Sequence, residues 1–148
     1  MTRLRLFLSV PFSSRVNESG NVESMFRAEV ERLIGGLRVY GNHVFCALEY
    51  DNWRIQSVAD PVDELKKDFA EIDACDRVVV LLEERVSSGI QLEKGYAYAK
   101  EKEIEVYQIG KPTWSNSAFS RLNGHEIIPV SDIKDFVDTV LKAYKPHS

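Results

Sequence analysis

The amino-acid sequence predicts an α/β fold: a doubly wound, five-stranded parallel sheet with helices on both of its faces. Segments with the alternation of strands and segments with the spacing of helices succeed each other along the whole chain. One strand-like run, 77–82, is almost continuously apolar and β-branched, as in strands that are covered on both faces. The length of 148 residues suits one domain, which we expect to span 1–148.

The first half of the chain supplies two strands and two helices. Residues 3–10 alternate as a strand, and from 22 to 37 apolar residues recur at helical spacing until a pair of glycines, which we interpret as a stop signal. A second strand is predicted at 43–48. Asp60 then predicts an N-cap ahead of Pro61 at the first helical position. The buried stripe of this second helix is predicted to comprise Val62, Leu65, Phe69 and Ile72.

The second half of the chain continues the alternation. The apolar, β-branched run precedes a helix from about 89 to 102, for which Ser88 and Gln91 form the expected capping box. After a fourth strand, residues 110–124 are polar and are predicted to be a long loop. The chain closes with a short fifth strand and a helix that we expect Ser131 to cap.

Strand–helix alternation implies right-handed crossovers and a flavodoxin-like or Rossmann-like sheet, in which ligands bind beyond the carboxyl ends of the strands. The first strand runs into "VPFSSR" instead of the glycine-rich turn that pyrophosphate binding requires, so a dinucleotide or flavin cofactor is disfavoured. We expect no cofactor. The loops predicted at the binding edge are 9–20, 47–60, 83–89 and 110–124.

Composition excludes several classes of function. A net charge of −4 argues against a protein dedicated to nucleic acids or anionic membranes, which need concentrated positive charge. No apolar run is long enough to span a membrane, and the basic, then apolar N-terminus reads better as a strand than as a signal peptide. Two cysteines without metal-like spacing are typical of free thiols in a cytoplasmic protein, and three scattered histidines give little support to a metal site.

Glu93 stands out within the stretch "SSGIQLEKGYA" at 87–97. Its neighbours on the predicted helix, Ile90, Tyr96 and Ala97, offer no cation, so a surface salt bridge along the helix does not explain it. It lies near the start of a helix, at the edge of the sheet where ligands bind. We expect the helix dipole to favour its ionised form, which suits a nucleophile.

A second carboxylate would complete a site for breaking a glycosidic bond. The preceding helix and the turn after it carry four candidates, and for most of them a solvated helix face is explanation enough. If one of them converges on Glu93 at about 5 Å, the pair fits a retaining mechanism with a covalent glycosyl-enzyme. The four candidates are Asp68, Glu71, Asp73 and Asp76.

A longer motif narrows this choice. An aspartate, a second aspartate eight residues later, a hydrophobic strand and a Gly-x-x-x-Glu-x-Gly-x-Ala helix start follow one another. Together they resemble the nucleoside 2-deoxyribosyltransferase superfamily, which includes 2′-deoxynucleoside 5′-phosphate N-hydrolases. In this chain the matching residues are Asp68, Asp76, Gly89, Glu93, Gly95 and Ala97.

The resemblance implies roles for these residues. Glu93 would attack C1′ as the base departs, and Asp68 would hold or protonate the leaving base. Gly89 would let the backbone approach the sugar, and Gly95 would permit tight helix–strand packing. Two positions depart from the family pattern. Lys94 replaces an apolar residue, and Phe7 is the nearest counterpart of a tyrosine that some transferases carry on the first strand.

The same resemblance separates hydrolases from transferases at the 5′ end of the substrate. Transferases place a carboxylate six residues before the glutamate, where phosphate-preferring hydrolases and this chain have a serine, Ser87. Ser117 matches a hydrolase serine that reaches the phosphate of the neighbouring subunit. In the first loop Ser13 and Arg15 are further candidate donors, although Phe12 stands where the hydrolases have arginine and ordinary turn chemistry explains the serine well.

The sequence therefore predicts an enzyme that hydrolyses the N-glycosidic bond of a nucleoside or deoxynucleoside 5′-monophosphate. A nucleoside 2-deoxyribosyltransferase and a non-catalytic nucleotide sensor stay open as alternatives. The expected partner is a small nucleotide or nucleoside, with a homodimer that shares its active sites, and no nucleic acid, membrane or metal. Trp53 and Trp114 lie in loops at the binding edge, where packing onto the domain is a commoner role than stacking on a base.

Overall fold

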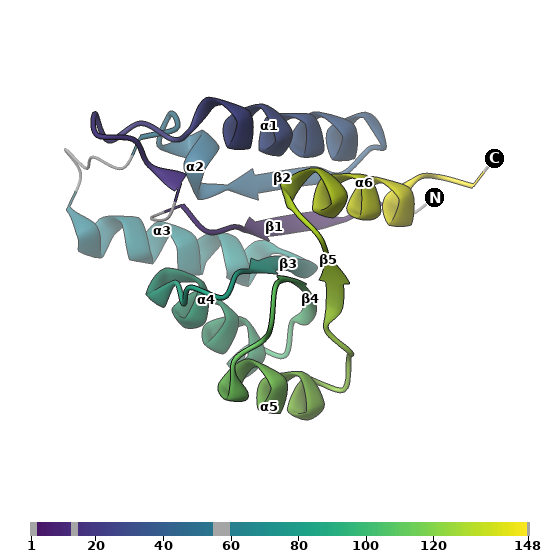
Figure 1. Cartoon of the computed structure of the whole chain (residues 1–148). Coiled ribbons are helices and arrows are strands. Elements are labelled where there is room, and N and C mark those ends of the chain that lie inside the picture. The colour runs from purple at the N-terminus through teal and green to yellow at the C-terminus, as the bar shows by residue number, and fades with distance from the viewer. Residues whose placement is uncertain (1–2, 13–14, 55–59, 148) are drawn as a thin grey trace.

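The computed structural model describes residues 3–12, 15–54 and 60–147. Its strands form one parallel sheet in the order β2-β1-β3-β4-β5, which confirms the predicted doubly wound fold (Figure 1). The strands are β1 (Arg5–Ser9), β2 (His43–Cys46), β3 (Arg77–Leu82), β4 (Glu103–Ile109) and β5 (Ile128–Val130). The helices are α1 (Ser24–Val39), α2 (Ala47–Tyr50), α3 (Pro61–Ala74), α4 (Ser88–Ala99), α5 (Trp114–Asn123) and α6 (Ile133–Tyr144).

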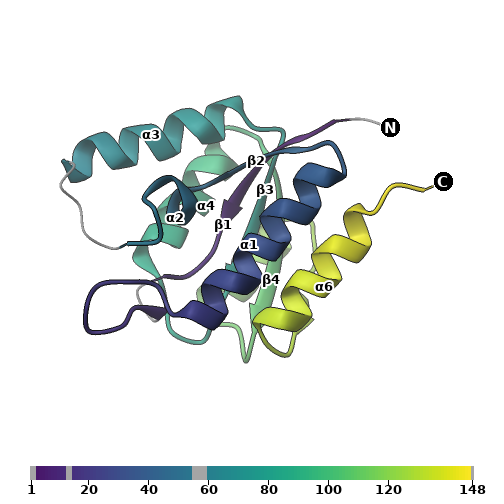
Figure 2. The same ribbon diagram turned by 90° about the horizontal axis from the view of Figure 1, so that it is seen from above.

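The sheet separates two apolar layers. Helices α1 and α6 lie side by side on one face, and α3 and α4 cover the other, with α5 outside α4 (Figures 1 and 2). Alternation along β1 divides its side chains accordingly: Leu6 and Leu8 face α1, and Phe7 faces α3. The central strand β3 is buried on both sides, as its continuous apolar sequence predicts.

Close helix packing corrects the interpretation of the glycine pair. Helix α1 continues through both glycines to Val39. A methyl group built on Gly36 would lie 2.5 Å from Cδ2 of Leu141, so glycine lets α6 approach α1 closely. The chain turns after the helix at Gly41, whose φ of +96° favours glycine.

The predicted loop at 110–124 is wrong, because most of it forms α5. The hydroxyl of Thr113 caps this helix by accepting a hydrogen bond from the Asn116 amide at 3.2 Å, and Gly124 ends it in the left-handed conformation. Few of its side chains are apolar, so the helical period is weak in the sequence. Capping of α6 also differs from expectation, since Asp132 and not Ser131 accepts from the first turn.

The predicted buried stripe of α3 is only half correct. Asp60 and Pro61 start the helix as expected, and Ile72 is fully buried. Val62 and Leu65 are 57% and 37% exposed, because the first turns of α3 project past the carboxyl ends of the strands (Figure 1). This overhang brings the middle of α3 beside the binding edge of the sheet. Within the described part of the chain, no helix has the length and apolarity needed to cross a membrane.

Candidate active site

The two carboxylates singled out by the sequence line one cavity. It has a volume of about 110 Å³ and lies at the carboxyl ends of β1 and β2, bordered by α2, α3 and α4. Glu93 and Asp68 both belong to its wall, so the structure brings together the pair that the motif predicts. The residues around it are Leu8, Ser9, Val10, Phe12, Cys46, Ala47, Leu48, Leu65, Asp68, Gly89 and Glu93.

Helix α4 holds Glu93 at this wall through its buried face. Ile90 and Ala97 are buried in the core beneath the helix, which fixes its rotation. The helix is capped by Ser87, whose hydroxyl accepts a hydrogen bond from the Ile90 amide at 3.4 Å. The capping box predicted from Ser88 and Gln91 is therefore wrong: the third helical position is Ile90, which cannot complete a box, and the Gln91 side chain donates to Asn116 instead.

Glu93 receives one hydrogen bond within the site. The hydroxyl of Ser9, at the end of β1, donates to Glu93 Oε1 at 2.8 Å. Burial raises the pKa of Glu93 to about 8; the Ser9 hydrogen bond opposes this rise and the nearby charge of Asp68 adds to it. Desolvation thus outweighs the helix dipole, contrary to the expectation that the dipole keeps this side chain ionised.

The pKa of Asp68 is also raised, to a lower value than that of Glu93. Burial raises its pKa to about 6, with further contributions from the charges of Asp51 and Glu64. Among the described residues it has no hydrogen-bond or ion-pair partner. Two interacting carboxyl groups with apparent pKa values on either side of neutrality share one proton near pH 7. Such a pair offers one ionised and one protonated carboxyl at the same time.

The other three carboxylates of this region have structural partners. Glu71 pairs within α3, Asp73 and Asp76 bind other elements, and all three lie outside the cavity. Of the four carboxylates, Asp68 alone lines the cavity together with Glu93. Glu71 binds Lys67 at 2.8 Å, Asp73 accepts from the Tyr96 hydroxyl at 2.8 Å, and Asp76 accepts from the Arg5 amide at 2.7 Å.

The residues expected at the 5′ end of a substrate are only partly assembled. Gly89 lines the cavity, and the Ser87 hydroxyl is 4.0 Å from the position of a Cβ built on it. Arg15 forms an ion pair with Glu83 at 2.5 Å and lies over the Phe26 ring. Ser117 is on α5 and does not line the cavity. The remaining candidate, Ser13, lies outside the described residues.

Sequence reasoning missed Ser9. Phe7, the nearest expected counterpart of a first-strand tyrosine, is 1% exposed and stacks on Phe45 in the core. Two residues further along the same face of β1, Ser9 is the side chain that meets Glu93. The available signal was period-two alternation, which puts a polar residue on a buried face at the binding edge.

Lys94, which departs from the family pattern, is part of the contact between α4 and α5. It is 4% exposed, donates to Asn116 Oδ1 at 2.5 Å and lies 4.4 Å from the centre of the Phe119 ring. Burial lowers its pKa to about 8. Gln91 donates to the same amide oxygen, so these two side chains of α4 hold α5 in place.

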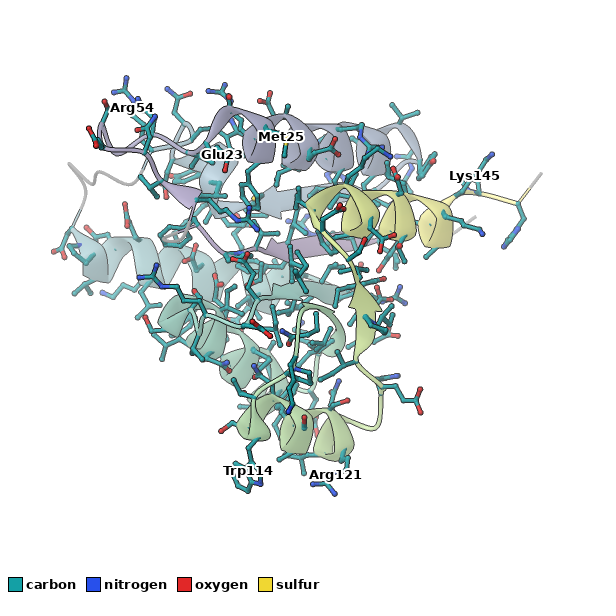
Figure 3. The ribbon with its side chains drawn as sticks, viewed as in Figure 1. Glu23, Met25, Arg54, Trp114, Arg121 and Lys145 are labelled. Atoms are coloured by element: carbon teal, nitrogen blue, oxygen red, sulfur yellow. The ribbon has the colours of Figure 1, made fainter. Side chains whose placement is uncertain are left out.

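The tryptophans do not enter the cavity. Trp53 is 5% exposed and packs in the core, while Trp114 is 83% exposed and points away from the molecule at the start of α5 (Figure 3). A larger cavity of about 270 Å³, lined by Arg5 and His43 among others, lies at the amino ends of the strands, and the carboxylate among its described lining residues, Glu71, is paired with Lys67. No cluster of three or more potential metal ligands occurs among the described residues.

Removing the charge of Glu93 is expected to stabilise the protein at alkaline pH. The native pKa of Glu93 is raised to about 8, so its ionisation costs stability as pH rises from about 4.5 to 8, by at most about 5 kcal/mol. In Glu93→Gln the amide oxygen still accepts from Ser9 and this loss disappears. Urea unfolding of both proteins at pH 5 and pH 9 measures the effect, and an equal difference in unfolding free energy at the two pH values contradicts it.

Comparison with known proteins shows which solved structures share this fold. Neither a protein-family model nor a curated protein sequence matches this chain. Among solved structures, the Clostridium botulinum CMP N-glycosidase BcmB has a TM-score of 0.66 at 20% identity, covering 92% of this chain and 96% of that one.

Two transferases are also structural neighbours. The 2-deoxyribosyltransferase of Leishmania mexicana has a TM-score of 0.64 at 13% identity, covering 97% of this chain and 99% of that one. That of Bacillus psychrosaccharolyticus has a TM-score of 0.60 at 17% identity, covering 93% of this chain and 95% of that one. The protein has the fold of N-glycosidases and nucleoside 2-deoxyribosyltransferases over nearly its whole length.

Proposed function

We propose that this protein hydrolyses the N-glycosidic bond of a nucleoside or deoxynucleoside 5′-monophosphate, through a glycosyl-enzyme on Glu93. The convergence of Glu93 and Asp68 in one cavity at the carboxyl ends of the strands carries the proposal. Neither carboxylate has a cation partner among the described residues, and burial raises the pKa of both. A structural role would instead pair them, as Glu71 and Asp73 of α3 are paired with Lys67 and Tyr96.

The geometry supports a two-step reaction. Glu93 attacks C1′, the bond from C1′ to the base nitrogen breaks with its electron pair going to the base, and Asp68 supplies the proton that neutralises it. Water then attacks C1′, Asp68 takes a proton from that water, and the Glu93 carboxylate leaves. In the free protein the two pKa values put the shared proton on Glu93 near pH 7. Positive charge that develops on the sugar stabilises ionised Glu93, so in the reacting complex this proton passes to Asp68, from which the base receives it.

The choice of hydrolysis over base exchange rests on the 5′ end of the substrate. Ser87 caps α4, where backbone amides and the helix dipole favour an anion. A carboxylate at this position would repel a phosphate, while a hydroxyl beside a helix start can donate to one. The structural likeness to a CMP N-glycosidase agrees with a nucleoside monophosphate as substrate.

We infer that a second copy of the chain completes the site. A cavity of about 110 Å³ is smaller than ordinary ligand pockets of about 300–1,000 Å³, and Ser117 lies away from it. On the outer face of α4, Leu92 is 55% exposed, Ala99 is exposed, and a Cβ on Gly95 would contact nothing. Tight packing of Gly95 within the chain is therefore not observed. We assign this face to a homodimer in which each copy brings Ser117 to its partner's site.

An assay of base release tests the function. Nucleosides and their 5′-monophosphates, in ribo and deoxy forms, are incubated with and without a competing base, and free base is measured by chromatography. We expect release from monophosphates only, without exchange products, and a loss of at least about 1,000-fold in Glu93→Gln because the nucleophile is gone.

The matched control for that assay is Glu71→Gln. It makes the same chemical change on α3 outside the cavity and should retain activity. Exchange between nucleosides identifies a transferase. Release from no substrate, or unchanged turnover in Glu93→Gln, removes the proposed function.

Charge at position 87 is expected to control the preference for phosphate. Both Ser87→Asp and Ser87→Asn preserve an N-cap, so the fold is retained in each. The aspartate alone repels the phosphate dianion and should lower the ratio of kcat/KM for monophosphate over nucleoside by about tenfold or more. An unchanged ratio in Ser87→Asp, or an equal loss in both variants, contradicts the assignment.

Disrupting the outer face of α4 is expected to separate the dimer. A chain of 16.9 kDa should sediment as a dimer, and Leu92→Glu as a monomer with little activity, because two charges cannot be buried together in the interface. Val39→Glu, at an 83% exposed apolar position on α1, is the control and should stay dimeric. A fully active wild-type monomer rules the interface out.

A further inference from the structure

Ser9 is the single alcohol in the described wall of the cavity. It is 2% exposed, ends β1, and its hydroxyl hydrogen is committed to Glu93 Oε1 at 2.8 Å. The other polar side chains of the wall are the two carboxyl groups and the Cys46 thiol; the rest of the wall is apolar or glycine. Because Ser9 donates its hydrogen to Glu93, the lone pairs of its oxygen are left to accept one.

Stereochemistry fixes which sugar group approaches this oxygen. In a β-nucleoside the base lies on one face of the ring, so a carboxylate that displaces it attacks C1′ from the opposite face. The 2′-hydroxyl of ribose projects from the adjacent carbon on that same, attacked face. It therefore comes beside the glutamate oxygen that does not attack C1′. The structure shows Ser9 bonded to one oxygen of Glu93, which leaves Oε2 for the attack.

We infer that the substrate is a ribonucleotide whose 2′-hydroxyl donates a hydrogen bond to Ser9. This inference rests on the proposed function, because it assumes that Glu93 faces C1′. A hydroxyl buried against this wall needs a partner, and among the described side chains of the wall Ser9 offers a neutral oxygen acceptor beside Glu93. The chain 2′-hydroxyl to Ser9 to Glu93 also strengthens the hydrogen bond that holds the nucleophile, since donors in series polarise one another.

A 2′-deoxy substrate loses this contact without leaving a buried charge. Ser9 would still donate to Glu93, so the site is expected to tolerate 2-deoxyribose less well and not to exclude it. One net hydrogen bond corresponds to a preference of about tenfold. The direction of the preference distinguishes this contact from a steric barrier. A steric barrier against the 2′-hydroxyl would disfavour the ribo substrate.

Matched ribo and 2′-deoxy 5′-monophosphates of the base that is released fastest test the inference. For the wild-type protein we expect kcat/KM to favour the ribo substrate by about tenfold. In Ser9→Ala that ratio should fall to about two or below, on top of a common loss from the misplaced nucleophile. Cys46→Ala changes another wall residue by a similar volume and should keep the wild-type ratio.

The ratio distinguishes selectivity from positioning. If Ser9 only positions Glu93, Ser9→Ala lowers kcat/KM for both sugars by the same factor, and the inference is overturned. A wild-type preference for the 2′-deoxy substrate overturns it as well. Collapse of the ratio in Ser9→Ala alone supports it.

Binding to Glu93→Gln separates this inference from the proposed function. Calorimetry with CMP and dCMP measures affinity without turnover, and the glutamine oxygen still accepts from Ser9. Tighter binding of CMP, abolished by adding Ser9→Ala, supports the 2′-hydroxyl contact even where the wild-type protein releases no base. Equal affinities with active base release overturn the contact and leave the proposed function standing.

Discussion

A carboxylate that is removed from water at the carboxyl edge of the sheet is the constraint on which the rest of this structure depends. Glu93, in the second turn of α4, is held against the end of β1, with a pKa raised to about 8 and one hydrogen bond from Ser9. Such a group destabilises the fold above its ordinary pKa. The surrounding core has to offset that cost, and the chemistry of the site follows from the same burial.

Burial and strand register hold the sheet beneath Glu93 in one arrangement. Strand β3 is buried on both faces, and Val80 pairs with Ser9 across the β1–β3 ladder. Register therefore fixes Ser9 relative to the central strand, and burial of Ile90 and Ala97 fixes α4 above it. The hydrogen bond from Ser9 to Glu93 joins two rigid elements, which is the arrangement that a positioned nucleophile needs.

Helix α4 has a different task on each face. Its inner residues enter the core, Glu93 forms the cavity wall, and Lys94 together with Gln91 ties α5 through Asn116. Its outer face is left uncovered. Lys94, at which this chain departs from the family motif, therefore belongs to the contact with α5 and lies outside the cavity wall.

Periodicity in the sequence by itself determined the fold class and most of the strands and helices, because it is a local property of the chain, and the family resemblance singled out Asp68 from four carboxylates as the partner of Glu93. The sequence could not place α5, whose polar face hides the helical period, or decide that Val62 is exposed, which depends on how far α3 overhangs the sheet. Only the tertiary structure brought Ser9 to Glu93, across 84 positions of sequence. Only it raised both pKa values, since desolvation is a property of the assembled cavity and of no residue alone.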